Sequence, residues 1–339
     1  MRHRERHPAE AGNRGGPGSS AELVLIGHVG WATDQTANGT ATHTGGSGFA
    51  TAFAASALLD GVGLVAQVGG DFDLDILRKL AIDMAGVAVL PGASATFFID
   101  QSRDGALSFS SDLGVATEPR FDLFPESYFR AGYVHLGTAP PKQQLAWLEF
   151  LRHKGCRAQV SVDMFEPFVM AEPGACREIC DRADLIFLNE AEYRGLYRAR
   201  PHLPAPTVLK RGPAGAEFWA PGVWHQIPAP PADEVDPIGA GEILAGSFLA
   251  LRARGLGEDR ALRYSVAAAT RSVTEFGVAG PGVTRELGRV REQLAVARDR
   301  GCTPRLALGT VPGDRTEGVD DEGDELVAGH RSDLLEPSQ

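Results

Sequence analysis

The sequence predicts an α/β fold with a mainly parallel central sheet, flanked by helices on both faces, and a small β lid. Short apolar runs of strand length alternate with longer segments of helical character, a pattern typical of parallel sheets. Two segments interrupt this alternation and predict a small additional β sheet, and a family resemblance described below implies that this sheet is a lid. The chain has 339 residues, of which 43% are hydrophobic and 23% charged, enough for one large core.

The expected elements follow one another in strand–helix order. Strand-like segments lie at residues 23–27, 64–68, 133–136, 159–163, 185–188 and 207–209. Segments of helical character lie at residues 51–59, 73–84, 144–153, 243–254 and 261–276. Ligands bind at the carboxyl ends of the strands in such sheets. Asp163 closes one strand and could contact phosphate or metal, although a plain strand-end acid is an equal alternative.

The lid is expected from about residues 31–44 and 95–110. The first segment is rich in Thr, Gly and Asn. The second alternates on both sides of Ser102-Arg103-Asp104-Gly105, and Asp-Gly between such arms is a hairpin signal. Phe98 and Phe109 on its two arms could pack against a ligand, but packing within the lid is the better expectation.

The two ends of the chain have the composition of disordered tails. Residues 1–20 are basic and rich in Gly and Pro, whereas residues 313–339 hold nine acids and two arginines in a chain of net charge −11. We therefore expect one domain at residues 21–305, between a basic tail and an acidic tail at 306–339. The basic tail is short and lacks aromatic residues, so no nucleic-acid binding is expected.

Nothing in the sequence indicates a membrane or a secreted protein. No apolar run reaches the ~18 residues that cross a bilayer, and the first residues lack the apolar core of a signal peptide. We expect a cytoplasmic protein that binds no membrane. The four cysteines form no metal-type pairs, and Cys176 and Cys180, one helical turn apart, are expected to be reduced packing residues.

The most informative residue is Glu242, which closes the run Asp236-Pro237-Ile238-Gly239-Ala240-Gly241-Glu242 ahead of a small-apolar stretch. A helix that begins here would present backbone N–H groups at its positive end, with a carboxylate alongside. Phosphoryl transfer to an alcohol needs both features: donors for the charge on the transferred group and a base for the hydroxyl. The alternative is an ordinary glycine turn before a buried helix.

This run resembles the C-terminal signature of the ribokinase-like (PfkB) family of sugar and nucleoside kinases. The usual sequence in this family is Asp-Thr-x-Gly-Ala-Gly-Asp. Its last Asp is the catalytic base, and the backbone amides of its Gly-Ala-Gly run surround the transferred phosphoryl group. The chain differs at Pro237, Ile238 and Glu242. Glutamate is one methylene longer than aspartate and places the carboxylate about 1 Å further from the backbone. A displacement of about this size can lower the rate of the catalysed reaction by about two orders of magnitude.

A second stretch, Gly45-Gly46-Ser47-Gly48-Phe49-Ala50, resembles the family's N-terminal signature, in which paired glycines let the backbone approach a sugar. The resemblance implies substrate contacts from Gly45, Gly46, Ser47 and position 50. The family has an asparagine there that binds substrate hydroxyls, whereas this chain has Ala50, which argues against simple ribose or fructose recognition. Asp34 is the nearest candidate for the family's sugar-binding aspartate.

Two further stretches match the family in the expected order. Asn189-Glu190-Ala191-Glu192 resembles its Asn-x-x-Glu element, which implies that Asn189 and Glu192 help to hold Mg²⁺ and phosphate through water. The alternative is a helix N-cap with an acid in the first turn. Lys210-Arg211-Gly212-Pro213-Ala214-Gly215 resembles the nucleotide-side loop and implies that Lys210, Gly212 and Gly215 bind ATP; the alternative is a basic turn.

The resemblance covers roughly residues 21 to 300 and implies an ATP- and Mg²⁺-dependent kinase of a sugar or nucleoside hydroxyl, with Glu242 in place of the usual aspartate base. It also implies a homodimer through the lid. Because two of the best-known side chains differ, a non-catalytic nucleotide- or sugar-binding regulatory protein is the alternative. A dinucleotide oxidoreductase is disfavoured because no Gly-x-Gly-x-x-Gly turn follows the strand at residues 23–26.

Overall fold

The computed structural model describes residues 21–101, 108–197 and 203–299. Its centre is a nine-stranded sheet whose strands lie side by side in the order β13 (Val223–Ile227), β12 (Ala216–Ala220), β11 (Thr207–Lys210), β10 (Leu185–Asn189), β9 (Gln159–Asp163), β8 (Tyr133–Leu136), β1 (Leu23–Ile26), β4 (Val62–Gly69) and β5 (Ile82–Leu90). From β11 to β5 all neighbours pair in parallel, whereas β12 and β13 extend the sheet as an antiparallel hairpin. The predicted mainly parallel sheet is confirmed.

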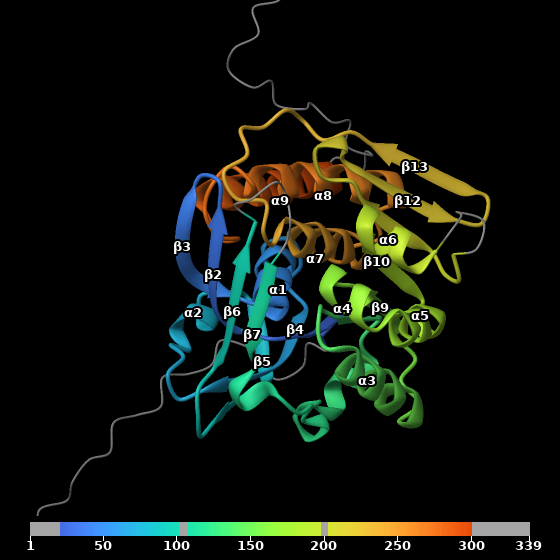
Figure 1. Ribbon diagram of the computed structural model, residues 1–339. Coiled ribbons are helices and arrows are strands. Elements are labelled where there is room, and N and C mark those ends of the chain that lie inside the picture. Colours follow the sequence, from blue (N-terminus) through green and yellow to red (C-terminus); the bar gives the residue numbers. More distant parts are fainter. Residues whose placement is uncertain (1–20, 102–107, 198–202, 300–339) are drawn as a thin grey trace, which may run out of the picture.

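Helices cover both faces of this sheet (Figure 1). One face carries α1 (Ser47–Leu58), α7 (Ala240–Ala253), α8 (Glu258–Ser272) and α9 (Pro281–Asp299). The other carries α3 (Pro141–His153), α4 (Glu166–Ala171), α5 (Pro173–Arg182) and α6 (Glu190–Leu196). Leu23 and Leu25 of β1 point into the first core and Val24 and Ile26 into the second, because successive strand residues face opposite sides.

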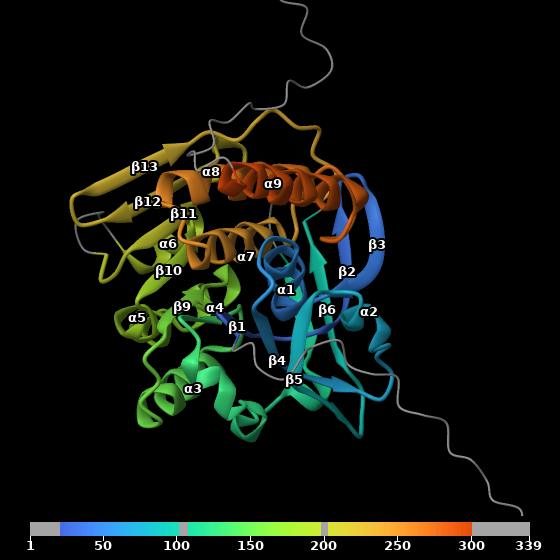
Figure 2. The same ribbon diagram turned by 180° about the vertical axis from the view of Figure 1, so that it is seen from behind.

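A separate four-stranded sheet forms the lid, in the order β3 (Gly39–Gly45), β2 (Gly30–Thr36), β6 (Ala95–Asp100) and β7 (Ser108–Asp112). Figures 1 and 2 both show it beside α1. The two predicted arms pair antiparallel, with Ile99 opposite Phe109. The predicted lid is therefore confirmed, although the turn at residues 102–105 lies outside the described residues, as do the two predicted tails.

One predicted element is wrong. The helix expected at residues 73–84 is reduced to α2 (Asp75–Arg78), and the chain enters β5 at Ile82. Ile82 pairs with Val62 and Asp83 with Gly63, so the edge of the parallel sheet takes these residues. Pairing with a neighbouring strand here outweighs local helical preference.

Tight packing fixes α1 against α7. A Cβ built on Gly246 of α7 would lie 2.4 Å from the carbonyl oxygen of Thr51 on α1, so the two helices approach to a distance that only glycine permits.

On the opposite face, Cys176 and Cys180 are buried on α5, where burial raises the pKa of the Cys176 thiol to about 11. Both are free cysteines, so their predicted packing role is confirmed. No helix among the described residues is long and apolar enough to cross a membrane.

Candidate active site

Two cavities share a wall at the start of α7. The first lies between the lid and the N-terminal end of α1, and we call it the lid cavity. The second is larger and lies over the loops that follow β10 and β11, and we call it the loop cavity. The residues common to both walls are Ile99, Thr138, Phe165, Ile238, Gly239 and Glu242. Glu242 and the first residues around the start of α7 therefore border both cavities.

The shared wall is built around a glycine that no other residue can replace without strain. Gly239 is the N-cap of α7 with φ 81°, and a Cβ there would lie 2.2 Å from Cγ1 of Val278. Glu242 follows in the first turn of α7, where the leading N–H groups of a helix lack partners within the helix. The Ala240 N–H already contacts the Pro237 carbonyl oxygen at 3.3 Å. The predicted cradle of Gly239, Ala240 and Gly241 thus stands at a helix N-terminus, with Glu242 beside it.

Lys210 brings a positive charge to this cradle. It ends β11, and its Nζ donates to Asp163 Oδ1 at 2.6 Å. A Cβ on Gly241 would lie 3.0 Å from the same Nζ, so the ammonium group lies against the cradle. Burial raises the pKa of Asp163 to about 6 although Lys210 opposes the shift, so the carboxyl is ionised at neutral pH. Within the described residues Asp163 Oδ2 has no hydrogen-bond partner.

Asn189 and Glu192 cap α6 reciprocally. The Asn189 side chain accepts from the Glu192 N–H at 2.8 Å, and Glu192 Oε2 accepts from the Asn189 N–H at 2.7 Å. Glu192 Oε1 accepts from Asn189 Nδ2 at 2.8 Å, so this capping box occupies both carboxylate oxygens. Burial raises the pKa of Glu192 to about 8. The N-cap alternative is confirmed; both residues also line the loop cavity, and their predicted Mg²⁺ role stays a prediction.

The loop after β11 has the backbone that its glycines predict. Gly212 has φ 52° and Gly215 φ 91°, and a Cβ on Gly215 would lie 2.0 Å from the Ile227 carbonyl oxygen. Both glycines line the loop cavity. Arg211 instead pairs with Glu190 at 2.8 Å and with Glu217 at 2.7 Å, which ties the loop to α6 and β12.

All the predicted substrate-side residues line the lid cavity, namely Asp34, Gly45, Gly46, Ser47 and Ala50. Gly46 has φ 93°, and a Cβ there would lie 2.5 Å from the His28 carbonyl oxygen. Asp34 is fully buried and bonded to His43. The structure thus brings these side chains to one side of Glu242 and the predicted nucleotide loop to the other.

The lid cavity is also lined by aromatic side chains that the sequence did not identify as site residues. Phe97, Phe165 and Phe168 line it together with Phe109, and Phe109 packs edge-on against Phe165 with ring centroids 4.7 Å apart. Phe98, in contrast, is 40% exposed and absent from the lining. Strand alternation puts Phe97 and Phe98 on opposite faces, but the sequence did not show which face is inward.

Comparison with known proteins identifies the family of this chain. The sequence profile described as pfkB family carbohydrate kinase matches residues 21–285. The chain belongs to the pfkB family. This pfkB kinase is 30% identical over 273 residues to a cytidine kinase of Thermococcus kodakarensis, a match that covers 76% of this chain and 97% of the relative.

Solved structures share the fold of this pfkB kinase at lower identity. A Burkholderia thailandensis nucleoside kinase in complex with inosine superposes with a TM-score of 0.65 at 18% identity, over 83% of this chain and 100% of that one. A putative ribokinase II from E. coli in complex with ATP and Mg²⁺ gives a TM-score of 0.66 at 18% identity, over 80% and 99%. The predicted ribokinase-like fold is therefore confirmed.

Proposed function

We propose that this pfkB kinase transfers the γ-phosphoryl group of ATP to the primary hydroxyl of a ribonucleoside. The observation that carries the proposal is that two cavities meet at Glu242 and at the N-terminus of α7. A kinase must bring two substrates together at one base and one set of N–H donors. The likeness to a cytidine kinase over nearly its whole length supports a nucleoside as the acceptor.

Each cavity has the chemistry that its substrate requires. The aromatic wall of the lid cavity, formed by Phe97, Phe109 and Phe165, suits the flat face of a nucleobase. The loop cavity offers Lys210 and the backbone of Gly212 and Gly215 to a polyphosphate. We therefore assign the nucleoside to the lid cavity and ATP to the loop cavity.

The proposed step needs one base and one anion site. Glu242 accepts the proton of the primary hydroxyl as that oxygen bonds to the γ-phosphorus. The bond from this phosphorus to the oxygen it shares with the β-phosphate breaks, and ADP leaves. The N–H groups at the start of α7 and the Lys210 ammonium stabilise the charge on the transferred group. The lid side chains exclude water, which would otherwise accept the phosphoryl group.

Mg²⁺ fits the oxygen-rich edge of the loop cavity. Asn189 and Glu192 would hold the ion through water, so their capping box would stay in place. Asp163 Oδ2, which has no partner among the described residues, is a further buried oxygen close to Glu192 and Lys210. Carboxylate oxygens and retained water suit this ion. When bound, Mg²⁺ neutralises charge on the phosphates.

The test is a panel of acceptors with ATP and Mg²⁺: four ribonucleosides, their 2′-deoxy forms, ribose and fructose. We expect acceptor-dependent ADP release with at least one ribonucleoside, and a nucleoside 5′-monophosphate identified by ³¹P NMR. Turnover with free sugars alone would contradict the nucleoside assignment and leave the pfkB fold and its base in place. The cytoplasmic location and the homodimer through the lid stay predictions.

A further inference from the structure

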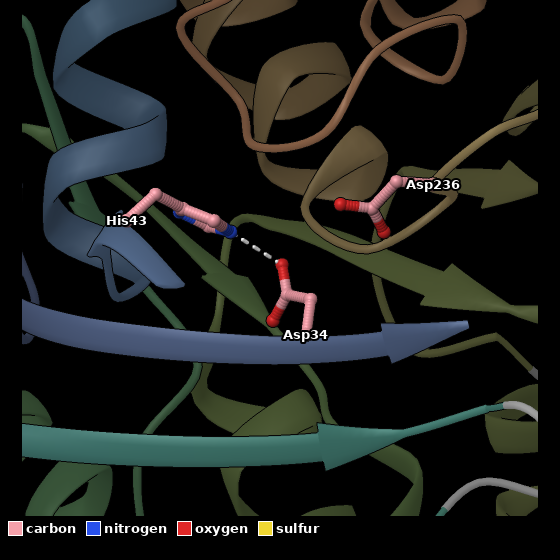
Figure 3. Close-up of side chains that lie close together, drawn as sticks. All are labelled: Asp34, His43 and Asp236. Carbon is pink, nitrogen blue, oxygen red and sulfur yellow. Dashed lines mark hydrogen bonds and ion pairs between the residues drawn. The ribbon is translucent and has the colours of Figure 1, made fainter. Parts of the chain in front are cut away.

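Three ionisable side chains meet at one end of the lid cavity (Figure 3). Asp34 comes from β2, His43 from β3, and Asp236 from the segment before α7. His43 Nε2 lies 2.7 Å from Asp34 Oδ2, and one ligand atom from each of the three residues lies within 4.8 Å of the others. The cluster joins the lid to the run that ends in Glu242.

His43 has acceptors at both ring nitrogens. Its Nδ1 lies 2.9 Å from the Thr44 carbonyl oxygen, and its Nε2 faces the Asp34 carboxylate. A neutral imidazole carries one N–H, so both contacts are made when the pair holds an additional proton, as an imidazolium beside a carboxylate. Burial alone would lower the pKa of His43, but the hydrogen bonds to Asp34 and Thr44 and the charges of Asp34 and Asp236 raise it above its usual value.

A proton fits this cluster better than a metal ion does. The 2.7 Å between His43 Nε2 and Asp34 Oδ2 is a hydrogen-bond distance and leaves no room for an ion between them. Both Asp236 oxygens are already used, because Oδ1 accepts from the Ile238 N–H and Oδ2 from the Gly277 N–H, each at 3.1 Å. Neither Asp34 nor Asp236 forms an ion pair with a lysine or arginine in the described part of the chain.

The pair leaves one carboxylate oxygen of Asp34 free. Oδ1 is buried without a partner among the described residues, while Oδ2 is held by His43. Asp34 lines the lid cavity, and an oxygen without a partner can accept a hydroxyl from a bound ligand without giving up an existing bond. Ala50, where the family has its hydroxyl-binding asparagine, offers nothing to compete for that ligand.

We propose that protonated His43 is a positioning residue for acceptor recognition: it holds Asp34 Oδ2 and so orients the carboxylate for Oδ1 to accept a ribose hydroxyl. Acceptor binding then depends on the charge of His43, whereas the phosphoryl transfer at Glu242 does not. This inference rests on the proposed nucleoside kinase activity and adds the residue that controls its acceptor specificity.

The direction of the pH dependence follows from the charges around His43. The charged groups that face it are Asp34 on the adjacent strand and Asp236 before α7, and both favour the imidazolium. Gly277 also lies near the ring, since a Cβ built on it would be 3.0 Å from His43 Cγ, and it carries no charge. The proton is therefore lost only as the pH rises through the raised pKa of His43. Acceptor affinity is strongest below that pH and weakens above it.

The first test is kinetic and uses His43→Gln, which keeps one N–H donor for Asp34 and removes the charge. At saturating Mg-ATP we expect the KM for the ribonucleoside to rise about ten- to a hundredfold, the loss typical of one charge-assisted hydrogen bond, while kcat changes less than about threefold. The rise of KM with pH that we expect in the wild type should be absent. His153→Gln, the same change at an exposed histidine of α3, is the matched control and should keep wild-type KM, kcat and pH profile.

The variant should also lose part of its preference for the ribonucleoside over the 2′- or the 3′-deoxy analogue. A purely structural role for His43 predicts something else: a lower melting temperature with KM and kcat impaired together and the pH profile retained. An unchanged KM in His43→Gln, or a fall in kcat alone, would also overturn the proposal.

The second test needs no acceptor, so it separates this inference from the proposed function. NMR titration of the histidine rings, with the His43 signal assigned from the His43→Gln spectrum, should give a pKa above the ordinary 6.5 in the wild type and a lower one in Asp34→Asn. A His43 that titrates at or below 6.5 in the wild type would overturn the inference, even if nucleoside phosphorylation is found. A raised value with no nucleoside turnover would refute the proposed function and keep the protonated pair.

Discussion

Replacing Lys210 with methionine should lower both stability and turnover. The ammonium and the Asp163 carboxylate are 2.6 Å apart, and the side chains are 14% and 0% exposed. Unit charges at this distance attract by about 6 kcal/mol at an effective dielectric constant of about 20, and lost hydration offsets much of that. Removing one partner of a buried pair costs about 3–5 kcal/mol, because the other charge is left without compensation. Methionine keeps the apolar stem, so the loss reports the charge.

The same variant should turn over about 10²- to 10³-fold more slowly, the loss typical of removing one group that stabilises transition-state charge. Its stability loss should also depend on pH. Burial already raises the pKa of Asp163 to about 6, and loss of Lys210 removes the cation that opposes the rise. The folded protein then holds a proton that the unfolded chain has released, so the free energy of unfolding falls as the pH rises. The destabilisation should be larger at pH 8 than at pH 5.5.

Urea unfolding at the two pH values, with kcat measured at pH 7.5, checks both effects. Lys142→Met is the matched control, because Lys142 is 85% exposed and its contact to Glu118 is 3.7 Å long. The double variant Lys210→Met with Asp163→Asn should be more stable than Lys210→Met alone, since no unpaired carboxylate remains. The reasoning is refuted if Lys210→Met unfolds and turns over like the Lys142 control, or if its destabilisation does not depend on pH.

Three further predictions concern a buried carboxyl group, a glycine between two helices and the Mg²⁺ ion. Burial raises the pKa of Glu192 to about 8, so the free energy of unfolding of the wild type in urea should fall as the pH rises towards 8. Glu192→Gln should reduce this fall, because the variant has no proton to release at that position. Gly246→Ala should cost about 1–3 kcal/mol in thermal unfolding by forcing α1 from α7, whereas Gly174→Ala, with open space around it, should not destabilise. Chelating Mg²⁺ with EDTA should abolish turnover, and added Mg²⁺ should restore it; turnover in excess EDTA would contradict the proposed metal role.

Much of the fold could be predicted because its strands are locally distinctive. Short segments with alternating apolar residues, Val134 and Leu136 in β8 and Val160 and Val162 in β9, marked these two strands at their observed bounds. The helix predicted at residues 73–84 was wrong because the local sequence there does not indicate a strand. Its charged and apolar residues fit a helix locally, and its strand β5 forms because β4 offers an unpaired edge, which the sequence does not show.

The candidate site was predictable where function leaves a local pattern. Glycine turns before a helix or a loop marked the wall at Gly239 and the loop at Gly215, because only glycine adopts their backbone without strain. Pairs that join distant strands were not predictable. Lys210 and Asp163 are 47 residues apart and meet because β9 and β11 flank β10. The contact of His43 with Asp34 across the lid hairpin was missed, since its register depends on the β2–β3 turn.

The measurement that tests the central claim most directly is turnover of a ribonucleoside by the wild type, Glu242→Gln and Glu242→Asp, at equal concentrations of folded protein. If Glu242 is the base at the meeting point of the two cavities, the glutamine variant should lose at least about a hundredfold in kcat, while KM for ATP changes little. The aspartate variant, with the residue that the family usually has, should retain measurable turnover. Turnover by Glu242→Gln at the wild-type rate would contradict the account, because the proton of the acceptor would then leave by another route.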